Sequence, residues 1–357
     1  MFIDLLFIFF YSLVSLFFIR KVAKQLQLVD CPDHRKCHEK ATPIAGGLAL
    51  CIILSNILYT RPELIAHNNL LLVSIIVLTI IGTLDDKFEL NIFVRLLTQI
   101  LLAVGFIYHS DFQINYLGNL FGFGEVRLHW LSGTITIAAI LGAMNAFNMI
   151  DGLNGLLGLL SVVTFSSLAV LFAFSGELKL AYFSIIIVVA IIPYICMNLG
   201  FLGRKRTVFM GDAGSMMIGF IAVWLLLCAS QGTQDTNFHT ISPVTVLWLI
   251  ALPLMDMTAT ITRRLRKGKS PFHCDQEHIH FILKSLGYSD NKTLMTITAL
   301  ATLFALIGIV SEIIHLPDAI MFYGFLCCFS VYFYTLIRLQ RYASKRKDTE
   351  PSIDEIS

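Results

Sequence analysis

Eleven apolar stretches divide this chain, and each is close to the length that crosses a bilayer as a helix. They lie at residues 1–19, 46–60, 69–84, 92–108, 130–148, 156–174, 180–199, 213–230, 242–262, 293–314 and 317–337. A helix needs about 20 apolar residues to cross the hydrocarbon core. The chain is 14% charged with a mean hydropathy of +0.76, whereas a soluble domain is nearer ~25% charged. We therefore predict an all-α polytopic membrane protein with about eleven transmembrane helices, of which the second and third have the shortest apolar stretches.

The first stretch, Met1 to Ile19, is interpreted as a retained span. Asp4 is its only charge, and it lacks the basic start and the small-residue cleavage site of a signal peptide.

The Lys and Arg residues are concentrated in alternate loops. If the loops after odd-numbered spans and the C-terminal tail share one side, that side holds 23 of the 26 basic residues. Only Arg61, Arg127 and Lys179 lie on the other side. Basic loops of membrane proteins stay in the cytoplasm, so we predict a periplasmic N-terminus and a cytoplasmic C-terminus.

No internal repeat and no Pro- or Ser-rich linker interrupts the chain. We expect a single transmembrane domain over residues 1–345 and a short polar cytoplasmic tail over residues 346–357. The net charge of +2 gives no reason to expect a nucleic-acid partner.

The stretch from Asn145 to Gly155 joins two apolar runs with a carboxylate, three amides and two glycines. Asn148, Asp151 and Asn154 are spaced three apart, so they would share one face at a helix end. Polar oxygens at the end of a membrane helix are costly unless they bind something. A ligand site is one interpretation of this stretch, and a polar turn between two helices is the other.

Asp85 and Asp86 end the third apolar stretch, and Arg95 lies ten residues further on. Adjacent carboxylates repel one another unless a cation is near. A lone Arg at the edge of an apolar run needs an anionic partner, and a lipid phosphate would suit it. The alternative for the acidic pair is a solvated helix cap.

Two further acids lie near the same predicted side. Asp212 stands between Gly211 and Ala213-Gly214 at the start of the eighth stretch, where free backbone N–H groups can face an anion. The alternative is an N-cap, but a cap does not require the flanking glycines, so we favour a ligand role. Asp256 lies within the ninth stretch near its predicted cytoplasmic end. It is either a site residue or bonded to a neighbouring helix.

The first and the longest internal loops carry basic and imidazole side chains. The basic run from Arg263 to Gly268, which contains Arg264, serves as an anchor on anionic lipid or as a substrate contact. His278 and His280 can bind a metal or phosphate oxygens. Lys36, in the first loop, is a candidate phosphate contact.

All of these residues fall on one membrane face under a topology assigned without them. Carboxylates, bases and free helix N-termini at one bilayer surface suit a reaction between phosphates, in which Mg²⁺ is held by one or two carboxylates and bridges substrate oxygens. A site at the membrane also implies that one substrate is a lipid.

The sequence resembles a known family over nearly its whole length. The polyprenyl-phosphate N-acetylhexosamine-1-phosphate transferases, of glycosyltransferase 4 type, have four motifs similar to Gly82 to Asp86, Asn145 to Gly155, Phe209 to Ser215 and the loop ending in His278-Ile279-His280. The branch that uses UDP-N-acetylglucosamine has segments similar to Arg204 to Arg206, Ile241 to Thr245 and Arg263 to Gly268.

This resemblance implies a function and its partners. The expected reaction transfers GlcNAc-1-phosphate from UDP-GlcNAc to undecaprenyl phosphate with Mg²⁺, or alternatively Mn²⁺, and releases UMP. It would be the first membrane step of O-antigen or enterobacterial common antigen synthesis, a part of lipopolysaccharide biosynthesis. The expected location is the bacterial inner membrane, with the active site facing the cytoplasm. A homodimer is compatible with the sequence, which does not determine the oligomeric state.

The resemblance also implies three groups of site residues. The catalytic group is Asp85, Asp86, Asp151 and His278. The substrate-binding group is Arg95, Asn154 and Arg264, to which the residues of the two internal loops add His280 and Lys36. The metal ligands are Asp212, with Asn148 as a second.

Two positions depart from the family pattern. Asn154 stands where this branch more often has Asp, which removes a charge but keeps an amide that can bond uracil. Phe281 replaces a third histidine, so no role that depends on that imidazole is carried over.

Two alternative functions remain open at this point. A sister transferase would use another UDP-N-acetylhexosamine; the muramoyl-pentapeptide nucleotide is disfavoured because His278 to Phe281 is not a run of histidines. An ion-coupled transporter would use Asp85, Asp86 and Asp256 as a relay, but transporters place such residues near the bilayer midplane.

Overall fold

The computed structural model describes residues 2–30, 41–110, 112–231, 241–271 and 277–349, with side chains described up to residue 343. Helices dominate these segments. In chain order the elements are α1 (Phe2–Gln25), β1 (Val29–Asp30), β2 (Thr42–Pro43), α2 (Gly46–Thr60), η1 (Pro62–Leu64), α3 (Asn68–Phe88), α4 (Ile92–Ser110), η2 (His129–Leu131), α5 (Ser132–Ile150), α6 (Leu156–Phe174), α7 (Leu178–Asn198), η3 (Arg204–Arg206), α8 (Gly211–Gln231), α9 (Pro243–Leu249), α10 (Ala251–Arg266), α11 (Ile279–Ser285), α12 (Asp290–Ile313) and α13 (Asp318–Thr349).

Each of the eleven apolar stretches is helical, which confirms the predicted all-α membrane fold. Among the described residues, nine helices are long and apolar enough to cross a membrane, and the bent pair α9 and α10 makes a tenth. The eleventh, α2, has 15 residues and is therefore about 22 Å long. It is shorter than the ~30 Å hydrocarbon core.

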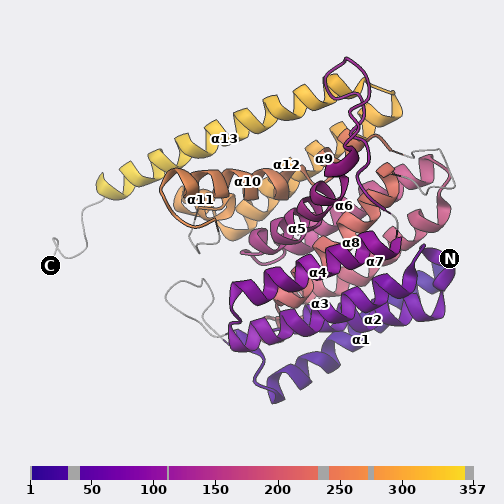
Figure 1. Cartoon of the computed structure of the whole chain (residues 1–357). Helices are drawn as coiled ribbons and strands as arrows, with labels where there is room; N and C mark the ends of the chain where they lie inside the picture. The colour runs from indigo at the N-terminus through magenta and orange to yellow at the C-terminus, as the bar shows by residue number, and fades with distance from the viewer. Residues whose placement is uncertain (1, 31–40, 111, 232–240, 272–276, 350–357) are drawn as a thin grey trace.

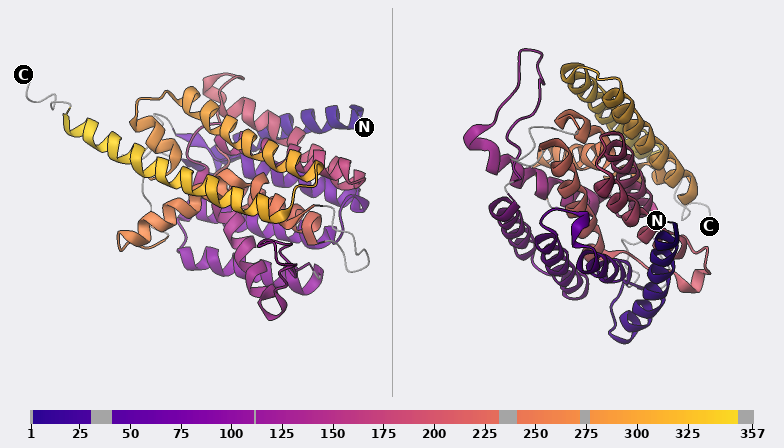
Figure 2. Two further views of the ribbon diagram at one scale, coloured as in Figure 1. Left: turned by 90° about the horizontal axis from the view of Figure 1, so that it is seen from above. Right: turned by 90° about the vertical axis from the view of Figure 1, so that its right-hand side faces the viewer.

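The helices run side by side as a bundle, with α1 at one edge and α13 at the other (Figure 1). Two further views show that α13 extends past the other helices at its C-terminal end (Figure 2). Helix α8 is central, and every residue of its most apolar stretch is buried. It packs mainly on α3 and α5, and also on α2 and α6. A helix that is apolar all round is suited to such a central place.

Small residues let α2 and α3 approach the start of α8 closely. A Cβ on Gly47 would lie 2.7 Å from the Cα of Gly214, and a Cβ on Gly82 would lie 2.8 Å from the carbonyl carbon of Asp212. Membrane helices associate through such small-residue contacts because no hydrophobic force drives them together within lipid. The approach brings the C-terminal end of α3 against the N-terminal end of α8.

The ninth predicted span is broken rather than continuous. Helices α9 and α10 meet at a bend of 80°. Pro253 has no N–H, so it cannot bond the carbonyl of Leu249 four residues earlier. The hydroxyl of Thr164 on α6 donates to that carbonyl at 3.3 Å, which satisfies a backbone group that the break would otherwise leave unpaired in an apolar setting.

A small strand pairing holds the chain at the end of the bundle where α8 begins. Strands β1 and β2 are antiparallel, with Asp30 opposite Thr42. Next to β2, Ile44 forms an isolated parallel bridge with Phe209. This pairing fixes the segment before α2 to the segment before α8 and places Asp30 at the same end.

Candidate active site

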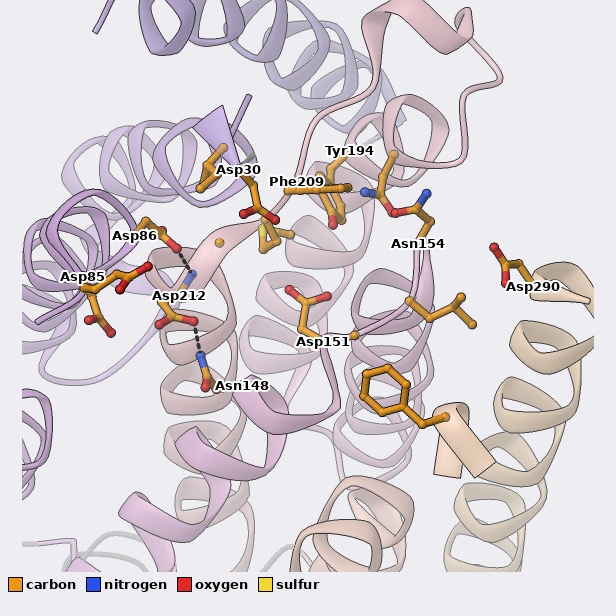
Figure 3. A pocket seen from close by; sticks show the side chains of 18 of the residues that line it. Asp30, Asp85, Asp86, Asn148, Asp151, Asn154, Tyr194, Phe209, Asp212 and Asp290 are labelled. Atoms are coloured by element: carbon orange, nitrogen blue, oxygen red, sulfur yellow. Dashed lines mark hydrogen bonds between the residues drawn. The ribbon is translucent and has the colours of Figure 1, made fainter. Parts of the chain in front are cut away.

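A cavity of about 470 Å³ opens where α3, α5 and α7 end and α8 begins. Its walls carry seven carboxylate side chains, from Asp30, Asp85, Asp86, Glu89, Asp151, Asp212 and Asp290. Figure 3 shows that the labelled aspartates come from both sides of the cavity. Because the chain alternates direction from helix to helix, segments up to 260 positions apart in sequence meet at one end of the bundle. The lining includes Asn148 and Asn154, so six of the predicted site residues share this cavity.

Arg95 links two of the acids. Its Nη1 lies 3.0 Å from the Oδ2 of Asp85 and 3.1 Å from the Oδ2 of Asp212. Asp85 is buried at the end of α3, and a buried carboxylate is tolerated when it is paired with a cation. The single guanidinium therefore holds the ends of α3, α4 and α8 together and neutralises part of the acidic wall.

Asp86 binds the first turn of α8 instead. Its Oδ1 accepts a hydrogen bond from the backbone N–H of Asp212 at 3.0 Å (Figure 3). Gly211 has a φ of +74°, and a Cβ there would overlap the carboxylate of Asp86. This position requires glycine for both reasons. The other oxygen of Asp86, Oδ2, is buried without a hydrogen-bond partner among the described residues.

Asn148 reaches Asp212 from the last turn of α5. Its Nδ2 donates to the Oδ1 of Asp212 at 2.7 Å and to the hydroxyl oxygen of Ser215 at 2.9 Å. Asn145, one turn earlier, donates instead to the side chain of buried Gln99 at 2.9 Å. Of the two amides, only Asn148 therefore lines the cavity.

Asp151 and Asn154 lie in the turn between α5 and α6. Burial and the nearby charge of Asp212 raise the pKa of the Asp151 carboxyl from 3.8 to about 7, because both disfavour the ionised form. The N–H of Gly155 donates to the side chain of Asn198, which ties this turn to the end of α7. The helix-end geometry expected for Asn148, Asp151 and Asn154 holds only for Asn148, since α5 ends at Ile150.

The two histidines occupy different positions relative to the cavity. His280 packs against Gly152, where a Cβ would overlap the imidazole ring, and Gly152 and Phe281 line the cavity. The ring of His278 stacks parallel to that of His280, with centroids 5.8 Å apart, and is not part of the lining. Burial lowers the pKa of His280 to about 4, so this imidazole is neutral at pH 7.

Arg264 lies apart from the cavity lining. It is buried near the end of α10 and donates to the carbonyl oxygen of Pro271 at 2.6 Å. Lys36 lies outside the described residues. The structure therefore brings together seven of the predicted site residues: Asp85, Asp86, Arg95, Asn148, Asp151, Asn154 and Asp212. His280 packs against the cavity lining, His278 lies behind His280, and Arg264 lies apart from the lining.

Several lining residues were missed by sequence reasoning. Asp30, Glu89, Tyr194 and Asn198 all line the cavity. Tyr194 and Asn198 lie in an apolar run that looks like any other span. Asp30 reaches the cavity through the pairing of β1 with β2, for which two-residue strands leave no periodic signal in the sequence.

The oxygen donors of the cavity fit a magnesium ion. No group of three or more His, Cys, Asp or Glu in the described segments is arranged to hold a metal. Mg²⁺ does not need such a group, because it binds one or two carboxylates and keeps water and phosphate as its other ligands. Asp212 beside Asn148, with the unpartnered buried oxygen of Asp86 close by, supplies that kind of donor set.

The fold and the site define a multi-pass membrane protein with an acidic cavity at one end of its helix bundle. Residues 69–230 match the sequence profile of the family described as glycosyl transferase family 4. The chain belongs to this family, as the resemblance of its motifs predicted.

Relatives cover almost the whole chain. It is 41% identical over 341 residues to the undecaprenyl-phosphate alpha-N-acetylglucosaminyl 1-phosphate transferase of Yersinia pestis, covering 95% of this chain and 92% of the relative. The protein of the same name from Escherichia coli K12 is 41% identical over 345 residues with the same coverage. The one from Pasteurella multocida is 41% identical over 342 residues, covering 96% of this chain and 95% of the relative.

Proposed function

We propose that this protein transfers GlcNAc-1-phosphate from UDP-GlcNAc to undecaprenyl phosphate and releases UMP. The observation that carries the proposal is the cavity at one end of the bundle, which Asp85, Asp86, Asp151, Asp212 and Asn148 line. Arg95 pairs with two of these acids, Asp85 and Asp212. The names of the relatives, which share about two fifths of its residues over nearly its full length, support the same acceptor and the same transferred group. The product would start the synthesis of a surface polysaccharide such as O-antigen or enterobacterial common antigen.

The reaction exchanges one phosphoanhydride bond for another. An oxygen of the lipid phosphate attacks the phosphorus of UDP-GlcNAc that carries the sugar, and the bond to the UMP phosphate breaks. A phosphate monoester has a second pKa near ~6, so at pH 7 the lipid phosphate is already an adequate nucleophile. No strong base is needed, and the main requirement is to bring two anions together.

The described side chains can meet that requirement as follows. Arg95, between Asp85 and Asp212, supplies a positive charge for the lipid phosphate. Asp151 and Asn154 line the turn that would receive the nucleotide. A bound Mg²⁺, held by Asp212 with Asn148 and Asp86 beside it, would offset the negative charge of the phosphates. His278, just before α11, and Arg264, near the end of α10, are proposed to act on the pyrophosphate or the sugar.

The cavity is proposed to face the cytoplasm of a bacterial inner membrane. The ends of α3, α5 and α7 and the start of α8 lie at the cavity, and the basic loops of the chain lie at the same end of the predicted topology. Loops rich in Lys and Arg stay in the cytoplasm, where UDP-sugars are made.

A transfer assay with purified protein tests this proposal. The protein in detergent is incubated with undecaprenyl phosphate, Mg²⁺ or Mn²⁺, and each of a panel of UDP-sugars, and UMP is measured. We expect UMP with UDP-GlcNAc, none without the lipid phosphate, and none with EDTA. UMP formation only with another UDP-N-acetylhexosamine would identify a sister transferase, and its absence with every donor would refute the proposal.

Asp212→Asn tests the proposed role of Asp212 as a metal ligand. The variant keeps the backbone N–H that binds Asp86 and stays isosteric, so we expect a folded protein. Transfer should fall by on the order of 100-fold or more, as for the loss of one preorganised electrostatic group. Near-normal activity would remove Asp212 from the metal site.

An ion-coupled transporter is less consistent with the geometry. Asp256, which would have to be part of its relay, is buried and accepts hydrogen bonds from three donors. Asp85 is paired with Arg95 at the end of the bundle, not near its middle, where transporter sites lie.

A further inference from the structure

A buried carboxylate outside the cavity has no part in the mechanism proposed above. Asp256, on α10, is 1% exposed. Its Oδ1 accepts from the backbone N–H of Ile279 at 3.0 Å and from the hydroxyl of Tyr332 at 3.0 Å. Its Oδ2 lies 2.7 Å from the Nδ1 of His278. The carboxylate thus connects α10, the start of α11 and α13.

The hydrogen bonds determine which nitrogen of His278 carries the proton. An N–H and an O–H both donate to Oδ1, and donors on a carboxylate favour its ionised form. An ionised carboxylate can only accept, so His278 has to donate through Nδ1–H to Oδ2. In a neutral imidazole the proton is then absent from Nε2, which becomes an acceptor.

We propose that Asp256 is a positioning residue that fixes the ring of His278 in the Nδ1–H tautomer and leaves Nε2 as a hydrogen-bond acceptor. This inference rests on the proposed function, in which His278 acts at the pyrophosphate or the sugar. A carboxylate behind an imidazole sets both its orientation and its tautomer wherever histidine does chemistry. Tyr332 holds the carboxylate from the opposite side, so α13 braces the arrangement.

The contacts beyond His278 lead to the cavity wall. Its ring stacks on that of His280, and His280 packs against Gly152, which lines the cavity. A rotation of the His278 ring would therefore disturb His280 and the turn that carries Asp151. Asp256 stabilises the position of both imidazoles through one buried group.

The tautomer of His278 can be measured without any assay of activity. The full-length protein is labelled with ¹⁵N-histidine, purified in detergent, and studied by NMR without substrate at a pH where the ring is neutral. His278→Gln identifies the signal by its loss. We expect a proton on Nδ1 and none on Nε2. A proton on Nε2, a mixture of tautomers, or a ring that stays doubly protonated would overturn the inference.

Asp256→Asn is the informative substitution. The amide can still accept from Ile279 and Tyr332 through its oxygen, and its NH₂ then faces Nδ1 and forces the proton to Nε2. We expect the opposite tautomer by NMR and a kcat reduced by about 10- to 100-fold, the range typical when the partner that orients a functional imidazole is lost. KM for both substrates should change much less, because the reacting groups still bind.

Tyr332→Phe is the matched control. It removes one hydroxyl from the same carboxylate but keeps the ring packed, so the Nδ1–H tautomer and most of the activity should remain. If this variant loses as much activity as Asp256→Asn with the tautomer unchanged, the network is only structural and the inference is wrong. If Asp256→Asn does not fold, the tautomer of His278 in the unmodified protein still tests the inference.

An unmodified protein that shows the Nδ1–H tautomer but no transfer would refute the proposed function and not the inference about Asp256.

Discussion

Arg95 shows how far the role of a single residue depends on distant segments. It stands alone at the start of an apolar run, and only the structure shows its contacts with Asp85 and Asp212. Its sequence position predicted an anionic partner; the partners it has are two carboxylates, to which a lipid phosphate would be added during turnover. Under the proposed function, an arginine shared in this way would serve both the stability of the site and the binding of substrate.

Replacing Arg95 tests whether its guanidinium binds the lipid phosphate or the nucleotide. Arg95→Ala should raise the KM for undecaprenyl phosphate by on the order of 10-fold or more, which corresponds to one lost charge-assisted hydrogen bond. The KM for the nucleotide should rise less, because Asp151 and Asn154 are untouched. Steady-state kinetics with each substrate varied in turn measures both. Equal increases would place Arg95 away from the lipid phosphate.

Asp151 gives a prediction about pH. The pKa of its carboxyl is 3.8 in the unfolded chain and about 7 in the fold, so between these values the folded state binds more protons. The contribution of this group to the free energy of unfolding therefore falls as pH rises from about 4 to about 7.

Asp151→Asn should remove the fall in the free energy of unfolding that the Asp151 carboxyl causes as pH rises. In detergent with EDTA, the variant should have a Tm higher than that of the parent by a few degrees at pH 8. The difference should shrink toward pH 5. Transfer activity, assayed separately with Mg²⁺, should fall at both pH values. A difference in Tm that does not change with pH would show that Asp151 has an ordinary pKa.

Among the elements, α8 decides the geometry of the site. Its first turn carries Asp212, binds Asp86 through a backbone N–H, and contacts Asn148 and Arg95. The contact with Asp86 depends on the closeness of α3, which Gly82 permits. The pattern of apolar residues predicted that both helices exist, but small residues decided how near they come.

Gly82→Ala tests this close approach. The added methyl group would collide with the backbone of α8, move the end of α3 away, and separate Asp85 and Asp86 from Asp212. We expect a loss of activity of at least about 10-fold, as for small displacements of positioning groups, and a lower Tm.

Gly105→Ala is the matched control for that experiment. Gly105 lies on α4 with no atom within 4 Å of an added Cβ, so Ala there should leave the activity unchanged and stabilise the helix by up to about 1 kcal/mol. If Gly82→Ala behaves like Gly105→Ala in both assays, the contact of α3 with α8 does not control the site.

For the whole molecule, the bias of Lys and Arg predicts which end faces which compartment. Lys205 lies in η3, just before α8 and the cavity. Phe123 lies in the loop before η2 at the opposite end and is 96% exposed. The two positions therefore report the two sides of the membrane.

Single cysteines at these positions, in a background without the eight native ones, test the orientation. In intact cells a membrane-impermeant maleimide should label position 123 at once, and position 205 only after the membrane is permeabilised. The reverse pattern would place the cavity in the periplasm, and labelling of both in intact cells would refute the assigned topology.

The sequence alone determined the apolar helices and the family to which the chain belongs. Apolar length is a local property, so every one of the eleven stretches became a helix, and the short motifs were sufficient to recognise the family. The sequence also shows Pro253, which cannot donate to the carbonyl of Leu249. The bend between α9 and α10 leaves this carbonyl in need of a donor, and that donor, Thr164, comes from another helix, so the sequence alone did not predict the bend.

Only the tertiary structure decided which of the candidate residues meet. It placed Asp30 and Asn198 in the cavity, His278 behind His280, and Arg264 outside the lining. Asp256, for which the sequence left two readings, proved to be bonded to neighbouring elements. The physical reason is that hydropathy fixes where a helix begins and ends, whereas the distances between helices follow from small residues, prolines and hydrogen bonds that act between segments remote in the chain.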